Sequence, residues 1–176
     1  MTEATLDDDA TTELEKFVLG LATYAGQLEG FGWVGDPEAP ADYDALRRAY
    51  DHSRATGSPL PVSNRHDERT IYRTRSGNLA FRFWHDMTHV KLGCDFDLEG
   101  ETRVAMAQLD ILRGFGFNPR SPEYRLLFAD TFGQSVYNLV VESFPDDQEG
   151  FVRTVLTSSL AGTIRHAVRG TEVELA

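Results

Sequence analysis

The chain has 176 residues, of which 41% are hydrophobic and 26% are charged, a composition typical of soluble globular proteins and not of disordered or fibrous chains. Its formal net charge of −11 argues against nucleic acid as a partner, because acidic residues outnumber those that could neutralise phosphates. A single cysteine, Cys94, excludes a disulfide framework.

A chain of this length suits one domain with a sizeable core. We predict a single domain over residues 1–176, with a flexible acidic N-terminal segment over residues 1–10. No apolar run is long enough to span a bilayer, and the first residues are acidic where a signal or transit peptide carries Arg or Lys. We therefore expect a cytoplasmic protein, and the sequence makes no prediction about its oligomeric state.

Hydrophobic residues recur at helical spacing along most of the chain, with little of the alternation that strands show. A first helix over about residues 12–28 should end at Gly30. Further helices are predicted over about residues 41–54, 78–93, 101–113, 121–143 and 146–170. Glycines and prolines over about residues 56–77 predict a loop-rich arm, with a short extended piece at residues 70–73. The expected fold is all-α, with about six helices packed as an irregular bundle.

The helix predicted over residues 78–93 carries the strongest chemical signal. It is apolar around most of its circumference, so it should be buried. His85 and His89 are four residues apart and therefore share one face, and Asp86 lies within about 100° of both. Burying these polar groups without partners is costly. One divalent metal ion would satisfy all three, and the ligand types suit Zn²⁺ before Fe²⁺ or Mn²⁺.

A further candidate ligand begins the next predicted helix. The short connection between the two helices should fold them back antiparallel, which brings Glu101 near His89. Glu99 is a close competitor, and Cys94 in the connection could also reach an ion. The predicted metal ligands are His85, Asp86, His89 and Glu101. Asp86 and Glu101 are also the candidate catalytic residues, because a carboxylate that does not bind metal can move protons.

The residues from His85 to Glu101 read His-Asp-x-x-His, eleven further residues, and then Glu. This pattern resembles the metal-binding motif of the fourth coenzyme-Q biosynthesis protein family, whose members are largely helical and place the motif beside an apolar pocket. The resemblance is confined to residues 85–101. It implies a metal site on two antiparallel helices, with the four predicted ligands as its signature positions.

A second pattern is similar to that of the phosphohydrolases named for their His-Asp pair. In that family an upstream His, the His-Asp doublet and a later Asp bind metal from helices. The corresponding residues here would be His66, His85, Asp86 and Asp130. This resemblance implies hydrolysis of a nucleotide phosphate, and it gives no role to His89 or Glu101.

The loop-rich arm holds a cluster of basic residues in an otherwise acidic chain. His66, Arg69 and Arg73 are candidates for substrate binding, since such side chains can hold a carboxylate or a phosphate. The alternative is that they pair with acids on the surface.

The sequence therefore predicts a metal-dependent enzyme that acts on a small molecule, without distinguishing a lyase, a hydrolase or an oxygenase. One alternative is a nucleotide phosphohydrolase of the His-Asp type. Another is a non-catalytic binding or regulatory protein with a structural metal ion or none, because a closed four-ligand site is structural whereas an open one is catalytic.

Overall fold

The computed structural model describes residues 6–65 and 67–174. These residues are mostly helical, which confirms the predicted fold class. In chain order the elements are α1 (Asp8–Glu29), β1 (Trp33–Asp36), α2 (Tyr43–Thr56), β2 (Leu60–Ser63), α3 (Arg75–Leu92), α4 (Leu98–Gly114), α5 (Pro122–Phe128), the π-helix η1 (Ala129–Gly133), α6 (Gln134–Val141), α7 (Gln148–Thr157) and α8 (Leu160–Glu174). No helix within the described ranges is both long and apolar enough to cross a membrane.

Helix α1 begins earlier than the sequence predicts. The side chain of Asp7 accepts hydrogen bonds from two backbone N–H groups of the first turn, so the helix starts at Asp8. Residues 8–10 of the segment predicted to be flexible are therefore helical, and residues 1–5 lie outside the described residues. Gly30 ends α1 as predicted, with a φ of 83° that glycine adopts without strain.

Two short strands form a parallel sheet that the sequence analysis does not predict. Strand β1 pairs with β2 from Trp33 opposite Leu60 to Asp36 opposite Ser63, and α2 connects them. The arm over residues 56–77 thus holds a strand at residues 60–63, and no strand at residues 70–73. Strands of four residues are too short for their alternation to stand out in a sequence.

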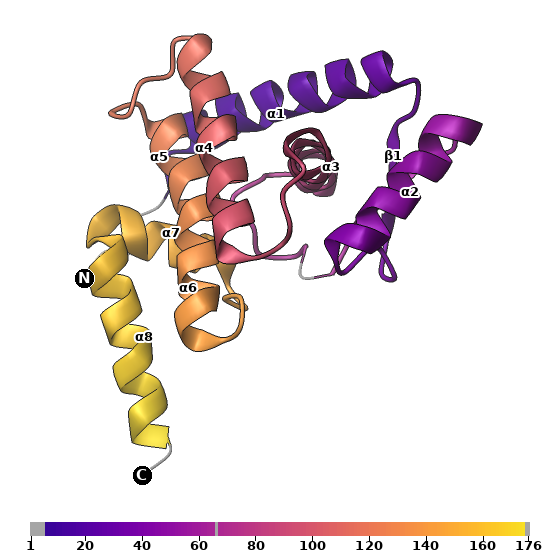
Figure 1. Ribbon diagram of the computed structural model, residues 1–176. Helices are drawn as coiled ribbons and strands as arrows, with labels where there is room; N and C mark the ends of the chain where they lie inside the picture. Colours follow the sequence, from indigo (N-terminus) through magenta and orange to yellow (C-terminus); the bar gives the residue numbers. More distant parts are fainter. Residues whose placement is uncertain (1–5, 66, 175–176) are drawn as a thin grey trace.

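Helix α3 is the centre of the molecule, and Figure 1 shows it with α1, α2 and α4 around it. Its buried side chains include Phe83, Trp84 and Met87. The buried carboxylate of Glu15 in α1 accepts hydrogen bonds from the backbone N–H groups of Arg73 and Thr74, just before α3 begins. Contacts on several sides therefore fix the position of α3 and of the side chains on its surface.

The helix predicted over residues 121–143 is interrupted by η1, which lies between α5 and α6. A π-helical turn takes an additional residue and so changes the direction of the side chains around it; such turns are frequent at functional sites. The helix predicted over residues 146–170 likewise divides into α7 and α8. The hydroxyl of Ser159 accepts a hydrogen bond from the N–H of Gly162, so a serine cap starts α8.

Candidate metal site

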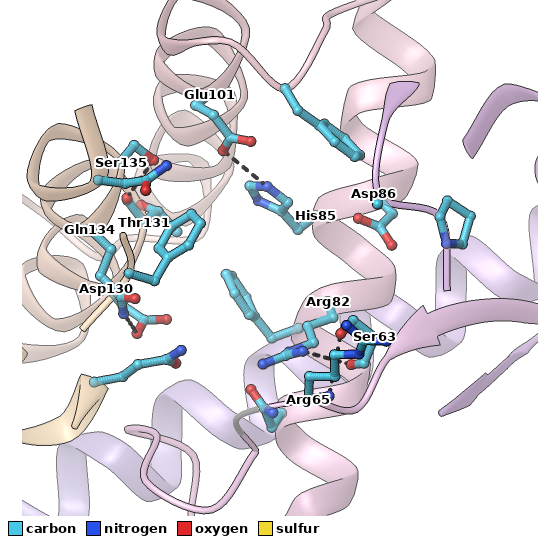
Figure 2. A pocket seen from close by; sticks show the side chains of 18 of the residues that line it. Ser63, Arg65, Arg82, His85, Asp86, Glu101, Asp130, Thr131, Gln134 and Ser135 are labelled. Carbon is cyan, nitrogen blue, oxygen red and sulfur yellow. Dashed lines mark hydrogen bonds and ion pairs between the residues drawn. The ribbon is translucent and has the colours of Figure 1, made fainter. Parts of the chain in front are cut away.

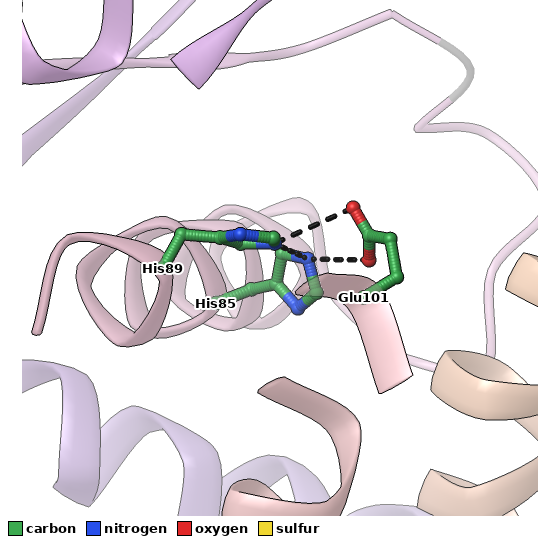
Figure 3. A group of neighbouring side chains, drawn as sticks. All are labelled: His85, His89 and Glu101. Atoms are coloured by element: carbon green, nitrogen blue, oxygen red, sulfur yellow. Dashed lines mark hydrogen bonds and ion pairs between the residues drawn. The ribbon is translucent and has the colours of Figure 1, made fainter. Parts of the chain in front are cut away.

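Three side chains, from His85 and His89 of α3 and Glu101 of α4, meet between the two helices (Figure 3). The Nε2 atoms of His85 and His89 are 3.1 Å apart. The Nε2 atom of His85 lies 3.3 Å from Oε2 of Glu101, and that of His89 lies 3.3 Å from Oε1 of the same carboxylate. His89 is fully buried, and the other two are partly buried. This group, the histidine–glutamate cluster, could hold a metal ion.

The turn between α3 and α4 brings Glu101 to the two histidines. Gly93 ends α3 with a φ of 63°, and Asp97 caps α4 by accepting a hydrogen bond from the N–H of Gly100. A side chain at Gly100 would collide with the carbonyl oxygen of Asp95, so this close turn requires glycine. Glu101 then lies in the first turn of α4, where the helix dipole favours a carboxylate.

The Nδ1 atom of each histidine ring faces a hydrogen-bond acceptor. It lies 3.0 Å from the carbonyl oxygen of Cys94 for His89, and 3.4 Å from Oε1 of Gln108 for His85. Because a carbonyl oxygen only accepts, the Nδ1 atoms carry the protons, and in the neutral rings the Nε2 atoms carry the lone pairs. The cluster thus directs two lone pairs and a carboxylate at one point, as the ligands of a cation do.

The separations within the cluster suit one divalent ion. With metal–ligand distances of about 2.0–2.1 Å, ligand atoms lie about 3.3–3.4 Å apart at the corners of a tetrahedron and about 3 Å apart at neighbouring corners of an octahedron. The 3.1 Å between the two nitrogens falls between these values, and each nitrogen lies 3.3 Å from a different oxygen of Glu101. The donor set of two imidazoles and one carboxylate fits Zn²⁺ and also Fe²⁺ or Mn²⁺, and it leaves at least one position for water or substrate.

The charges in the cluster favour a protonated His85 and an ionised Glu101. Burial favours the neutral His85 ring, but the charge of Glu101 and its hydrogen bond outweigh burial and raise the pKa of His85 to about 9. Burial also opposes the ionised form of Glu101, yet the two histidines hold its pKa well below its usual range. A metal ion therefore has to displace a proton from His85 near neutral pH.

A cavity of about 600 Å³ adjoins the cluster, and His85 and Glu101 line it (Figure 2). Its other polar lining includes Arg65, Arg82, Asp86, Asp130, Thr131, Gln134 and Ser135. Its apolar lining includes Phe81, Phe96, Leu98, Leu139 and Phe144. A cavity of this size with mixed apolar and polar walls suits a small molecule.

Asp86, one of the predicted ligands, lies in the wall of the cavity and not in the group of His85, His89 and Glu101. Neighbouring residues of a helix point about 100° apart, and Figure 2 shows Asp86 on the side of His85 away from Glu101. Burial raises the pKa of Asp86 to about 6, against the charges of the histidines. The structure therefore brings together three of the four predicted ligands.

Asp130 lines the same cavity from η1, across from α3. Its carboxylate accepts a hydrogen bond of 2.8 Å from Nε2 of Gln134, and burial raises its pKa to about 7 against the charges of Arg82 and His85. Asp130 does not join the histidine–glutamate cluster, and His66 lies outside the described residues. The described residues thus do not assemble the ligand set of the His-Asp phosphohydrolases.

The predicted substrate-binding arginines of the arm do not line the cavity. Arg69 is exposed, and Arg73 forms an ion pair of 2.9 Å with Asp8, in keeping with the surface alternative. Among the described residues, the arginines that line the cavity are Arg65 and Arg82. Arg82 precedes His85 by three residues on α3, so their side chains are neighbours on the helix surface. This spacing could have identified Arg82 from the sequence.

No known protein family, curated protein or solved structure matches this chain. The resemblance of residues 85–101 to the coenzyme-Q biosynthesis family is confirmed only in that His85, His89 and Glu101 form a group that could hold a metal ion. The function of the site is therefore inferred from its own residues.

Proposed function

We propose that the protein binds one divalent metal ion through His85, His89 and Glu101 and is an enzyme that acts on a small molecule in the adjoining cavity. The observation that carries this proposal is the meeting of two ring nitrogens and a carboxylate, 3.1–3.3 Å apart, at the wall of a cavity of about 600 Å³. Zn²⁺ is proposed before Fe²⁺ or Mn²⁺ because two histidines and one glutamate are a protein ligand set of catalytic zinc sites.

The residues around the cluster have different roles in the proposed reaction. A bound divalent ion polarises a substrate oxygen or activates a water molecule. Gln108 and the Cys94 carbonyl hold the histidine rings in orientation. Glu101 serves as a ligand, which leaves Asp86 and Asp130 as the cavity carboxylates that can move protons. Asp130, with a pKa of about 7, is suited to take up and release a proton at neutral pH.

An enzyme is favoured over a structural metal protein by the number of ligands. A structural zinc site is closed by four protein ligands, whereas this cluster offers three and borders a cavity. If the metal ion were only structural, a chelator would lower the thermal stability of the protein and have no other effect. The proposed enzyme predicts in addition that small molecules bind in the cavity near the ion.

The test is the metal content of the purified protein, measured by mass spectrometry after equilibration with Zn²⁺ and removal of free ions. We expect about one ion per chain in the wild type and a loss of most of it in His89→Ala and Glu101→Ala. The matched controls are His52→Ala and Glu99→Ala, which remove an exposed histidine and the neighbouring exposed glutamate. A double variant His85→Ala/His89→Ala that keeps a full complement of metal would refute the proposal.

A further inference from the structure

Arg82 is a cationic side chain in the cavity wall that forms no ion pair with any described residue. It is partly buried, and burial lowers its pKa against the opposing charges of Asp86, Asp67 and Asp130. Among the described residues, no carboxylate lies within 4.0 Å of its guanidinium group, whereas Arg65, the other arginine of the cavity, is paired with Glu38 at 2.9 Å. A desolvated guanidinium without a bound carboxylate is a ready site for an anion.

The guanidinium group of Arg82 is held in place by the backbone. Its Nη1 atom donates a hydrogen bond of 2.8 Å to the carbonyl oxygen of Ser63, at the end of β2. This contact uses one of the five N–H groups of the side chain and leaves the others for a ligand. Because the orientation is fixed in advance, little side-chain entropy is lost when an anion binds.

Arg82 and the metal-binding residues follow one face of α3. Positions 82, 85 and 89 are spaced by three and four residues, so their side chains lie in one row, with Arg82 about 4.5 Å along the helix axis from His85. Figure 2 shows Arg82 and His85 on the same wall, facing Asp130 and Gln134. A small molecule could therefore contact Arg82 at one end and the histidine–glutamate cluster at the other.

We propose that Arg82 binds the carboxylate of a small monocarboxylic acid whose apolar body packs on the aromatic and aliphatic lining and whose far end reaches the histidine–glutamate cluster. This inference rests on the proposed function, since it names the substrate class of the same site. The apolar body is inferred from Phe81, Phe96 and Leu98, together with Leu139 and Phe144, which are 57% and 54% exposed. Surface of this kind at a cavity is covered when an apolar ligand binds.

A singly charged acid is favoured over a phosphate monoester by the charges around Arg82. Asp86 and Asp130 lie in the same lining, and Asp86 follows Arg82 by four residues on the same helix. At the Arg82 end of the cavity a dianion would face both of these acidic side chains with one unpaired guanidinium, whereas a carboxylate matches that guanidinium in charge and in its paired acceptor oxygens.

The test uses the zinc-equilibrated full chain and three probes that share one ring: 4-fluorobenzoate, 4-fluorobenzamide and 4-fluorophenyl phosphate. Binding is followed by fluorine NMR titration, and zinc is measured on the same samples. We expect saturable binding of the benzoate, weakened about tenfold or more in Arg82→Gln and partly retained in Arg82→Lys. The uncharged 4-fluorobenzamide should bind the wild type and Arg82→Gln with about equal affinity. Arg69→Gln, which removes an exposed arginine outside the cavity, is the matched control.

Each of the other possible results contradicts one part of the proposal. Equal benzoate affinity in wild type and in a folded Arg82→Gln protein, or no binding of benzoate at all, contradicts the role of Arg82. Binding that survives in Arg82→Gln but disappears in His89→Ala would place the carboxylate on the ion instead. Tighter, Arg82-dependent binding of the phosphate would overturn the choice of a carboxylate. If the wild type holds no zinc but binds benzoate through Arg82, the proposed metal function fails and the anion site remains.

Discussion

The Nε2 atoms of His85 and His89 face each other at 3.1 Å, and Nδ1 of His89 lies 3.0 Å from the carbonyl oxygen of Cys94. The ring of His89 thus has its proton on the outer side and its lone pair toward the inside of the cluster. Two lone pairs at this distance repel each other unless a proton or a metal ion lies between them. The raised pKa of His85, about 9, means that a proton has this role in the metal-free protein, and a metal ion would replace the proton and be held by Glu101 as well.

Removal of the metal should destabilise the protein. A ligand that binds only the folded state at 1,000 times its dissociation constant adds about 4 kcal/mol to the free energy of unfolding. We expect the thermal midpoint of the zinc-equilibrated wild type to fall when a chelator is added, and that of His85→Ala/His89→Ala to stay unchanged. A chelator that leaves the wild-type midpoint unmoved would count against a tightly bound ion.

Gln108 should tune the affinity for metal without supporting the fold. Its side chain is fully buried, its Oε1 faces Nδ1 of His85, and its Nε2 has no hydrogen-bond partner among the described residues. Gln108→Leu should weaken zinc binding about tenfold, because the ring loses its orienting acceptor, while the metal-free protein stays at least as stable. Competition with a coloured chelator measures the affinity, and Gln27→Leu on the exposed face of α1 is the control. An unchanged affinity would show that Gln108 does not orient His85.

Asp130 should make the stability depend on pH. The pKa of this carboxyl is raised to about 7 in the folded protein because it is buried, with Arg82, His85, Gln134 and Tyr72 facing it. The folded state therefore binds the proton more tightly than the unfolded chain, in which the group titrates near pH 4. Its contribution to stability is present below about pH 4 and is lost as the pH rises toward 7, by up to about 4 kcal/mol.

Asp130→Asn removes this titration and keeps an acceptor for Gln134. The variant should gain stability over the wild type as the pH is raised from about 4 to 7. The measurement is the free energy of unfolding in urea, with chelator present, at several pH values; groups common to both proteins cancel in the difference. A difference that does not change with pH would contradict the raised pKa.

Gly77 should be intolerant of a side chain although it lies in a helix. A Cβ at this position would lie 2.5 Å from Cδ of Glu15, whose carboxylate binds the backbone before α3. Gly77→Ala should therefore destabilise the protein by about 2 kcal/mol. The control is Gly20→Ala in the exposed part of α1, where a Cβ would meet no described atom within 4 Å beyond the adjacent backbone and where alanine should add up to about 1 kcal/mol to the free energy of unfolding. Denaturant unfolding of both variants measures the contrast, and equal effects would contradict the close packing at Gly77.

The sequence predicts well what depends on a long periodic pattern. Hydrophobic spacing predicts the apolar helix around His85, and Gly93 predicts its end and the return of the chain toward Glu101. The structure has both features, in α3 and α4. The strands β1 and β2 are too short for a pattern. The π-helix η1, which carries Asp130 into the cavity, has no sequence signal of its own.

The cavity residues were harder to predict for a related reason. Asp86 lies four residues after Arg82 and three before His89, so helical spacing alone places it in the same row, yet it lies in the cavity wall outside the histidine–glutamate cluster. Arg82 is three residues from His85 and lies in the same row. Helical spacing thus identifies the candidate side chains of α3, the tertiary structure decides which of them meet Glu101, and α6 adds residues that only the tertiary structure brings near.

The most direct test of the metal site is a crystal structure of the zinc-equilibrated protein, with diffraction data collected above and below the zinc absorption edge. We expect one anomalous peak between α3 and α4, about 2.0–2.2 Å from Nε2 of His85, Nε2 of His89 and an oxygen of Glu101, with an open coordination position facing the cavity. Crystals that diffract well but show no peak there, or zinc held only by surface carboxylates, would contradict it.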